Sequence, residues 1–149
     1  MINYNFDWVL VNQLAVGPAP KNDIALKKLE ENNIVSILSL CSVEEAILPK
    51  DIEKKFECFR IVLPDHKSKN LITTDEINKT LDKVEIIINK GPLLIHCLAG
   101  IERSPLICMG WLMKKHSLTF EEALTYVMDI HKGTNPLPNQ LSILRKALS

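Results

Sequence analysis

The sequence predicts an α/β fold: a central, mostly parallel sheet of about five strands, flanked by helices on both faces. Short apolar runs alternate with longer segments in which apolar residues recur at helical spacing. Helix-capping patterns precede several of the longer segments. Strands connected by helices run in the same direction, so this alternation indicates a parallel sheet. With 149 residues, 46% of them hydrophobic, we expect one domain, residues 1–149, with one core.

The first third of the chain is predicted to contain three strands and one helix. Residues 8–11 and 14–16 are two short apolar runs that only two polar residues separate. Asn22 is a good N-cap, and the paired asparagines at 32–33 are suited to end the helix that it begins. The apolar run 34–40 then predicts a buried strand.

The next segment is predicted to be mainly helical before it returns to the sheet. Ser42 and Glu45 have the spacing of a capping box, which predicts a short helix as far as Pro49. A further helical turn is expected in residues 51–56. Residues 57–63 predict a strand that delivers the sequence Pro-Asp-His at its carboxyl end.

The second half is predicted to contain one strand and four helices. Two capping boxes, Thr73 with Glu76 and Thr119 with Glu122, mark helix starts. The predicted elements are a helix to about residue 90, a strand at 93–95, and helices at 105–116, 120–131 and 139–147.

Charge and cysteine content narrow the classes of function. Lysine and arginine number 18 and aspartate and glutamate also 18, so no general field attracts nucleic acid or an anionic membrane. The four cysteines stand singly, which argues against a disulfide framework and a zinc site. The sequence contains neither a signal-peptide pattern nor an apolar run long enough to span a bilayer. We therefore expect a cytoplasmic protein that binds neither nucleic acid nor membrane and needs no metal or cofactor.

One stretch, His-Cys-Leu-Ala-Gly-Ile-Glu-Arg-Ser-Pro at residues 96–105, has the features of a phosphate-binding loop. An apolar run precedes it and another follows it, so it is predicted to join a buried strand to a buried helix. Such a loop can point its N–H groups at an anion, and the helix N-terminus adds partial positive charge. Gly100 permits the turn, Ser104 suits the N-cap and Pro105 the first helical position.

The side chains of this loop point to phosphate chemistry. Arg103 can donate two parallel hydrogen bonds to two phosphate oxygens. A helix N-terminus and a nearby cation favour the thiolate form of Cys97, and His96 can fix the loop through a backbone hydrogen bond. The predicted phosphate-binding residues are Leu98, Ala99, Gly100, Ile101, Glu102 and Arg103. An anion-binding loop without catalysis remains an alternative, as does a buried core cysteine at position 97.

The residues His96-Cys97-x-x-Gly100-x-x-Arg103-Ser104 resemble the signature of the protein tyrosine phosphatase superfamily. The chain length, and Leu-Pro-Asp ending at Asp65, 32 positions before Cys97, are similar to its dual-specificity branch. The resemblance is strongest over residues 62–140. It implies a phosphotyrosine protein phosphatase-like fold. It also implies metal-independent hydrolysis of phosphomonoesters on protein tyrosine and on serine or threonine, through a phosphocysteine intermediate.

Phosphomonoester hydrolysis needs a nucleophile, donors for the equatorial oxygens and an acid for the leaving oxygen. We predict Cys97 as the nucleophile, Arg103 as the cation that stabilises the transition state, and Asp65 as general acid and then base. Asp65 follows a strand end, as Cys97 does, but a surface turn residue is the alternative reading. The hydroxyl of Ser104 is predicted to donate to the thiolate, and Gln140 to position water as a glutamine does in some relatives.

Glu102 is unusual in this loop, because an acid weakens its field unless the side chain points away from the anion. The loop carries no lysine between Cys97 and Arg103, unlike many phosphoinositide-specific relatives. We therefore expect phosphorylated proteins or peptides as substrates, and phosphate- or sulfate-like anions as ligands of the loop. The alternatives are a phosphatase for phosphoinositides or nucleotides, and a non-catalytic phospho-binding pseudophosphatase.

Overall fold

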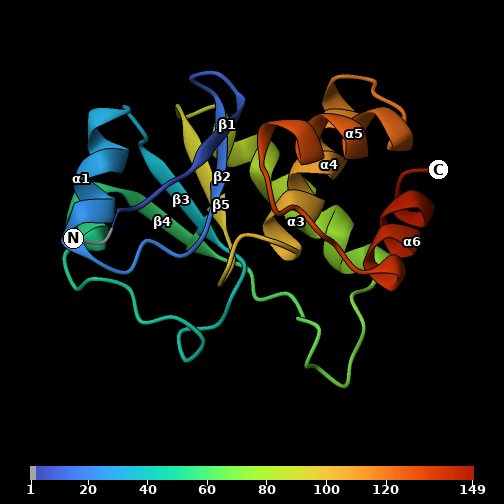
Figure 1. The fold of residues 1–149 in the computed structure, drawn as a ribbon, viewed down its shortest axis with the longest axis horizontal. Helices are drawn as coiled ribbons and strands as arrows, with labels where there is room; N and C mark the ends of the chain where they lie inside the picture. Colours follow the sequence, from blue (N-terminus) through green and yellow to red (C-terminus); the bar gives the residue numbers. More distant parts are fainter. Residues whose placement is uncertain (1–2) are drawn as a thin grey trace.

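The computed structural model describes residues 3–149, built around a five-stranded sheet with the order β1-β2-β5-β3-β4 (Figure 1). The antiparallel pair joins β1 (Asp7–Leu10) to β2 (Leu14–Gly17). The parallel pairs join β2 to β5 (Leu93–His96), β5 to β3 (Ser36–Ser39), and β3 to β4 (Glu57–Arg60). The predicted mostly parallel sheet of five strands is confirmed.

Helices cover both faces of the sheet, as predicted (Figure 1). The helices of the described residues are α1 (Asp23–Glu31), α2 (Ile52–Lys55), α3 (Thr74–Ile88), α4 (Arg103–Lys115), α5 (Phe120–Ile130) and α6 (Pro138–Ala147). Apolar side chains of α1 and α2 pack on one face, and those of α3, α4, α5 and α6 form the larger cluster on the other. The sheet therefore separates two apolar clusters.

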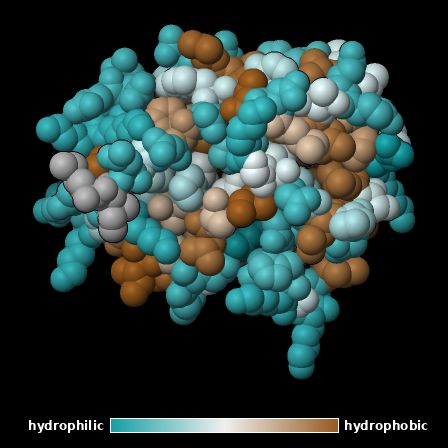
Figure 2. All heavy atoms as spheres, viewed as in Figure 1, coloured by the Kyte–Doolittle hydropathy of each residue, from teal (hydrophilic) through white to brown (hydrophobic). Residues whose placement is uncertain are grey.

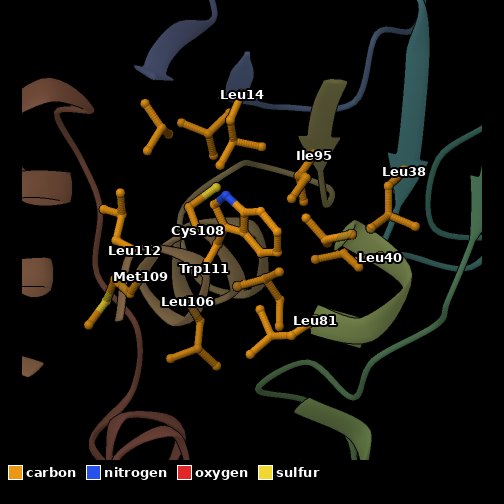
Figure 3. Packing of buried hydrophobic residues seen from close by; sticks show 14 of the residues in the cluster. Leu14, Leu38, Leu40, Leu81, Ile95, Leu106, Cys108, Met109, Trp111 and Leu112 are labelled. Carbon is orange, nitrogen blue, oxygen red and sulfur yellow. The ribbon is translucent and has the colours of Figure 1, made fainter. Parts of the chain in front are cut away.

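The central strand β5 shows why both faces must be covered. Leu93 and Ile95 point into the larger cluster and Leu94 into the smaller one, and all three are fully buried. Figure 3 shows Ile95 of β5 pointing toward Trp111 of α4, and Leu38 of β3 at the side of the same cluster. Because β5 and α4 are both deeply buried, the loop that joins them has two fixed ends.

The face of the molecule drawn in Figure 2 is mainly polar. Figure 2 shows hydrophilic side chains over most of the face that it draws, with apolar side chains in smaller patches between them. Within residues 3–149, no helix combines the length and the apolar character needed to cross a bilayer.

Capping patterns correctly predicted the starts of three of the six helices in the described residues. The side chain of Asn22 accepts a hydrogen bond from the N–H of Ala25, so this predicted cap is confirmed. Both predicted capping boxes, after Thr73 and after Thr119, are also formed. The local pattern sufficed here because the cap and its partner both belong to the first turn of the same helix.

The predicted helix between Ser42 and Pro49 is wrong. The reciprocal capping bonds do form: Ser42 N–H donates to Glu45 Oε2 at 2.8 Å, and Glu45 N–H to Ser42 Oγ at 3.2 Å. However, the segment makes only a turn. Pro49 disfavours a helical conformation at the residue before it, so too few residues remain to offset the cost of nucleating a helix.

The predicted N-cap of α4 is also wrong. The helix begins at Arg103 and Glu102 precedes it, so Ser104 and Pro105 both lie in the first turn. Proline is tolerated there because the first N–H groups of a helix have no partner within the helix. The strands predicted at 34–40 and 57–63 are shorter than expected. Pairing continues beyond β4, where Ile61 and Leu63 donate to carbonyls at the end of β3.

Candidate active site

The candidate site lies where β5 ends and α4 begins. The loops that follow β3, β4 and β5 all leave the sheet at its carboxyl end, which is the lower end in Figure 1. This is the edge at which open α/β sheets usually bind ligands. The loop 97–102, which we call the cradle, therefore faces the segments that carry Glu45 and Asp65.

A pocket of about 180 Å³ brings together most of the predicted site residues. It is lined by Asp65, His66, Cys97, Leu98, Ala99, Ile101, Glu102 and Arg103. Cys97 is only 3% exposed, and its Sγ lies 3.2 Å from the Oγ of Ser104. The thiol therefore stands on the floor of the pocket, beside a hydroxyl that can donate to it.

Arg103 is buried and firmly held. Its Nη2 donates to Glu45 Oε1 at 2.8 Å. Its Nη1 donates to the carbonyls of Leu40 at 3.2 Å and Leu63 at 3.0 Å. Two donors of the guanidinium, the Nε–H and one Nη2–H, take part in no hydrogen bond within residues 3–149. Those two donors form one side of the planar fork, which matches two oxygens of a phosphate.

Glu45 is a site residue that the sequence analysis did not identify. Its hydrogen bond with Arg103 is the main reason that the pKa of Glu45 lies below the ordinary carboxyl value. The capping pattern assigned this side chain to a local helix, whereas it reaches Arg103 at the start of α4. Its position after a strand end, at the same edge as Asp65, was the available signal.

His96 fixes the peptide that follows it. Its Nδ1 lies 2.9 Å from the carbonyl oxygen of Cys97, which can only accept, so Nδ1 carries the hydrogen. Nε2 then accepts from the hydroxyl of Ser39 at 2.6 Å. Burial lowers the pKa of His96 to about 4, so the ring is neutral at pH 7. Ser39 is a second supporting residue that the sequence analysis missed.

The carbonyls of the cradle accept hydrogen bonds from groups outside it, and these bonds determine the shape of the cradle. The carbonyl of Leu98 accepts from Ala19 N–H at 3.0 Å, and that of Ile101 from Asn135 N–H at 2.8 Å. His131 Nε2 lies 2.7 Å from the carbonyl of Gly100. The hydrogen bonds formed within residues 3–149 use these carbonyls but not the N–H groups of residues 98–102. The cradle therefore keeps its own donors available for an anion.

Gly100 is required by this arrangement. Its φ of +75° lies in the left-handed region, which costs a residue with a side chain. A Cβ at this position would also lie 2.7 Å from the backbone carbon of Gly17. The cradle can therefore approach the end of β2 only with glycine here.

The remaining predicted residues lie in or next to the pocket. Asp65 is half-buried, lines the pocket, and accepts from Lys67 N–H through Oδ1 at 2.9 Å, as a turn residue also would. Gln140 is 3% exposed, its Oε1 accepts from Leu137 N–H, and its Nε2 donates to Glu102. Catalysis by Asp65 and placement of water by Gln140 stay predictions.

The fold thus places Cys97, Arg103 and a loop with available N–H groups in one pocket at the carboxyl edge of a parallel sheet. The family described as "Dual specificity phosphatase, catalytic domain" matches residues 18–148. The chain therefore belongs to the dual specificity phosphatase catalytic-domain family, and the predicted resemblance is confirmed.

Several proteins of similar sequence are named dual specificity protein phosphatases. A probable dual specificity protein phosphatase of Dictyostelium discoideum is 31% identical over 110 residues, which are 74% of this chain and 27% of that protein. Dual specificity protein phosphatase 1B of Arabidopsis thaliana is 29% identical over 119 residues, 79% of this chain and 68% of that protein. Human dual specificity protein phosphatase 5 is 32% identical over 75 residues, half of this chain and 20% of that protein. The chain thus spans less than a third of two of these relatives.

Solved structures share the fold. Tk-PTP in its active form superposes with a TM-score of 0.79 at 20% identity, over 95% of each chain. PTPMT1 in complex with PI(5)P gives a TM-score of 0.80 at 18% identity, over 95% of this chain and 93% of that one. The phosphotyrosine protein phosphatase-like fold is confirmed.

We expect the variant Glu45→Gln to destabilise the protein by about 2 kcal/mol at pH 7, because it leaves a buried guanidinium without its anion. The lowered pKa of Glu45 means that this contribution is present above the ordinary carboxyl range and is lost as pH falls through the lowered value. Urea unfolding from pH 7 downward measures it, and the stability difference from the wild type should shrink in acid.

The neighbouring exposed carboxylate supplies a matched control. Glu44→Gln makes the same charge change in the same turn and should alter stability by less than about 0.5 kcal/mol. Equal losses in the two variants would contradict the assignment of Glu45 as the anchor of Arg103.

Proposed function

We propose that this chain is a cysteine-dependent phosphatase that hydrolyses phosphomonoesters on tyrosine and on serine or threonine of proteins. The observation that carries the proposal is the shared pocket of Cys97, Arg103 and Asp65 at the carboxyl end of β5. The family match over residues 18–148 supports the same reaction class. A phosphate bound by the cradle would have its phosphorus directly above the sulfur.

In the first step, the thiolate of Cys97 attacks phosphorus in line with the leaving oxygen. The S–P bond forms, the P–O ester bond breaks, and Asp65 gives its proton to the leaving oxygen. In the second step, a water attacks phosphorus and passes a proton to the carboxylate of Asp65. The S–P bond breaks, inorganic phosphate leaves, and the hydroxyl of Ser104 donates to the thiolate that re-forms.

The cradle supplies the electrostatic part of this mechanism. Its N–H groups and the free side of the Arg103 fork bind the equatorial oxygens, on which charge is spread in the transition state. The donors are already oriented, because the loop carbonyls are bonded outward and Arg103 is bonded to Glu45. The scheme uses no metal or cofactor.

Protein substrates are favoured by the chain's own residues and by the names of its relatives. The cradle offers no lysine for further phosphates and contains one acid, Glu102, which disfavours highly anionic headgroups. The relatives named above are called protein phosphatases. We also infer a reducing, cytoplasmic compartment, because all four cysteines are free thiols, Cys97 among them.

A phosphoinositide phosphatase is the second candidate. The observation in its favour is the fold shared with PTPMT1, whose structure holds PI(5)P. At 18% identity, this similarity concerns the fold and not the substrate.

We expect Cys97→Ser to abolish hydrolysis of an aryl phosphate while the protein still binds inorganic phosphate, because serine keeps the cradle but is a much poorer nucleophile. Phosphate release and calorimetric titration measure the two properties. Cys58→Ser, at a half-buried thiol outside the pocket, is the control and should keep activity. A Cys97→Ser enzyme that still turns over would refute the nucleophile assignment. Phosphate binding without turnover in the wild type would favour the non-catalytic alternative.

We expect Asp65→Asn to slow turnover of aryl phosphates with poor leaving groups by about 100-fold, and those with good leaving groups far less, because only the former need protonation. Rates across a series of substituted phenols measure this dependence. Asp51→Asn removes an exposed carboxylate outside the pocket and should leave the series unchanged. An equal loss for all phenols in Asp65→Asn would assign the acid elsewhere.

A substrate panel separates the two candidate functions. At matched concentrations we expect turnover of phosphotyrosine and phosphoserine or phosphothreonine peptides to exceed that of phosphoinositides and nucleotides by about tenfold or more, because Glu102 opposes additional phosphates. Phosphate release under one set of conditions gives kcat/KM for each. A preference for the lipid would replace the protein-phosphatase proposal with the second candidate.

A further inference from the structure

The carboxylate of Glu102 lines the pocket yet has no role in binding an anion. A negative charge there opposes a phosphate, so its presence needs another explanation. Both of its oxygens are engaged. Oε2 lies 2.9 Å from Nδ1 of His66, and Oε1 accepts from Nε2 of Gln140 at 3.2 Å. Because a carboxylate can only accept, the Nδ1 of His66 carries the hydrogen.

Gln140 anchors Glu102 to the body of the protein. It lies in the first turn of α6 and is 3% exposed. Its Oε1 accepts from the N–H of Leu137 at 2.7 Å, which leaves the amide nitrogen directed at Glu102. The carboxylate is therefore fixed from one side by a buried side chain whose own orientation is fixed.

His66 belongs to the segment 65–71, which we call the acid loop. Most of its residues are exposed. Its other hydrogen bonds, among the residues that the structure describes, join the loop to itself: Lys67 N–H to Asp65 Oδ1, Ser68 N–H to the Asp65 carbonyl, and Asn70 N–H to Ser68 Oγ. Within the described chain, the bond from His66 to Glu102 is therefore the polar link between the acid loop and the cradle.

We propose that Glu102 and His66 are positioning residues that hold Asp65 over the cradle, an inference that rests on the proposed function. His66 is the residue next to Asp65, and both line the pocket with Cys97. A proton donor must lie within hydrogen-bond reach of the leaving oxygen, and small misplacements of such a group cost large factors in rate. The bridge links Asp65 to the same loop that holds the phosphate.

The two partners have opposite effects on anion binding. Removing Glu102 takes a negative charge out of the pocket, so phosphate should bind more tightly. Removing His66 leaves the carboxylate without this donor, so phosphate should bind less tightly. Both changes release the acid loop and should impair protonation of the leaving group in the same way. A general loss of packing would not produce these paired signs.

The experiment compares Glu102→Ala, His66→Ala and the double variant on aryl phosphates with good and poor leaving groups. For poor leaving groups we expect kcat to fall about tenfold in each variant, while good leaving groups are nearly unaffected. This is the pattern expected when Asp65 protonates the leaving oxygen less efficiently. The inhibition constant of inorganic phosphate should fall in Glu102→Ala and rise in His66→Ala. The double variant should be no slower than either single one, because one bridge is lost in each case.

Two further variants provide the controls. Asparagine can place a donor close to the Nδ1 position, so His66→Asn should restore much of the rate that His66→Ala loses. Lys69→Ala changes an exposed residue of the same acid loop and should leave the leaving-group dependence unchanged. Thermal unfolding confirms that each variant is folded.

Equal losses for good and poor leaving groups, or additive losses in the double variant, would overturn the inference and leave the proposed function standing. A wild-type protein that hydrolyses no phosphomonoester would instead refute the proposed function. The bridge can then still be judged without turnover. Amide hydrogen exchange in residues 65–71 should be faster in both single variants, and unchanged exchange would refute the bridge.

Discussion

The buried guanidinium of Arg103 is the constraint on which the rest of the site depends. A charge with so little exposure is tolerated only when it is paired and hydrogen-bonded, and Glu45 together with two strand-end carbonyls meets that condition. The carbonyls belong to Leu40 and Leu63, each just beyond a strand of the sheet. One side chain therefore ties the ends of β3 and β4 to the start of α4, and these bonds leave two of its five N–H donors, Nε–H and one Nη2–H, unbonded within residues 3–149.

The backbone of the cradle is likewise held by hydrogen bonds to other parts of the protein. Its carbonyls are turned outward and bonded to the segments after β2 and after α5, so within residues 3–149 the N–H groups of residues 98–102 remain available as donors. Gly100 allows the close approach to Gly17 on which this depends. In the proposed mechanism these donors are already oriented before a phosphate binds, and a reaction that develops charge on phosphate oxygens gains most from donors that need no rearrangement. The acid loop differs from the cradle because most of its residues are exposed. The proposed bridge between His66 and Glu102 would hold this loop in place.

Sequence reasoning succeeded where the determining contacts are local. The strand–loop–helix around Cys97, the glycine at its turn and the caps of α1, α3 and α5 all depend on neighbours within a few residues. The shared pocket of Asp65 and Cys97 also followed, because the carboxyl ends of parallel strands meet at one edge. The pattern of apolar runs was enough to predict that edge.

Sequence reasoning failed where the role of a residue depends on a partner that is distant in the sequence. The pattern at Ser42 and Glu45 forms the bonds of a capping box, but the other use of that carboxylate is 58 positions away at Arg103. Ser39 could not be paired with His96 from the sequence, since the two meet only across β3 and β5. Ser104 was predicted to be a cap because it precedes an apolar helix, but α4 already begins at Arg103. Its hydroxyl does lie next to Cys97, as its predicted role as a donor to the thiolate requires.

In the proposed reaction, the sulfur of Cys97, held on the floor of the pocket, takes the phosphoryl group from the substrate. Rapid acid quench of the wild-type enzyme during turnover of an aryl phosphate, followed by mass spectrometry of its peptides, tests this most directly. We expect one added phosphoryl group on the peptide that contains Cys97, appearing before steady state and absent in unreacted protein. Turnover without that adduct at early times, or an adduct on another residue, would contradict it.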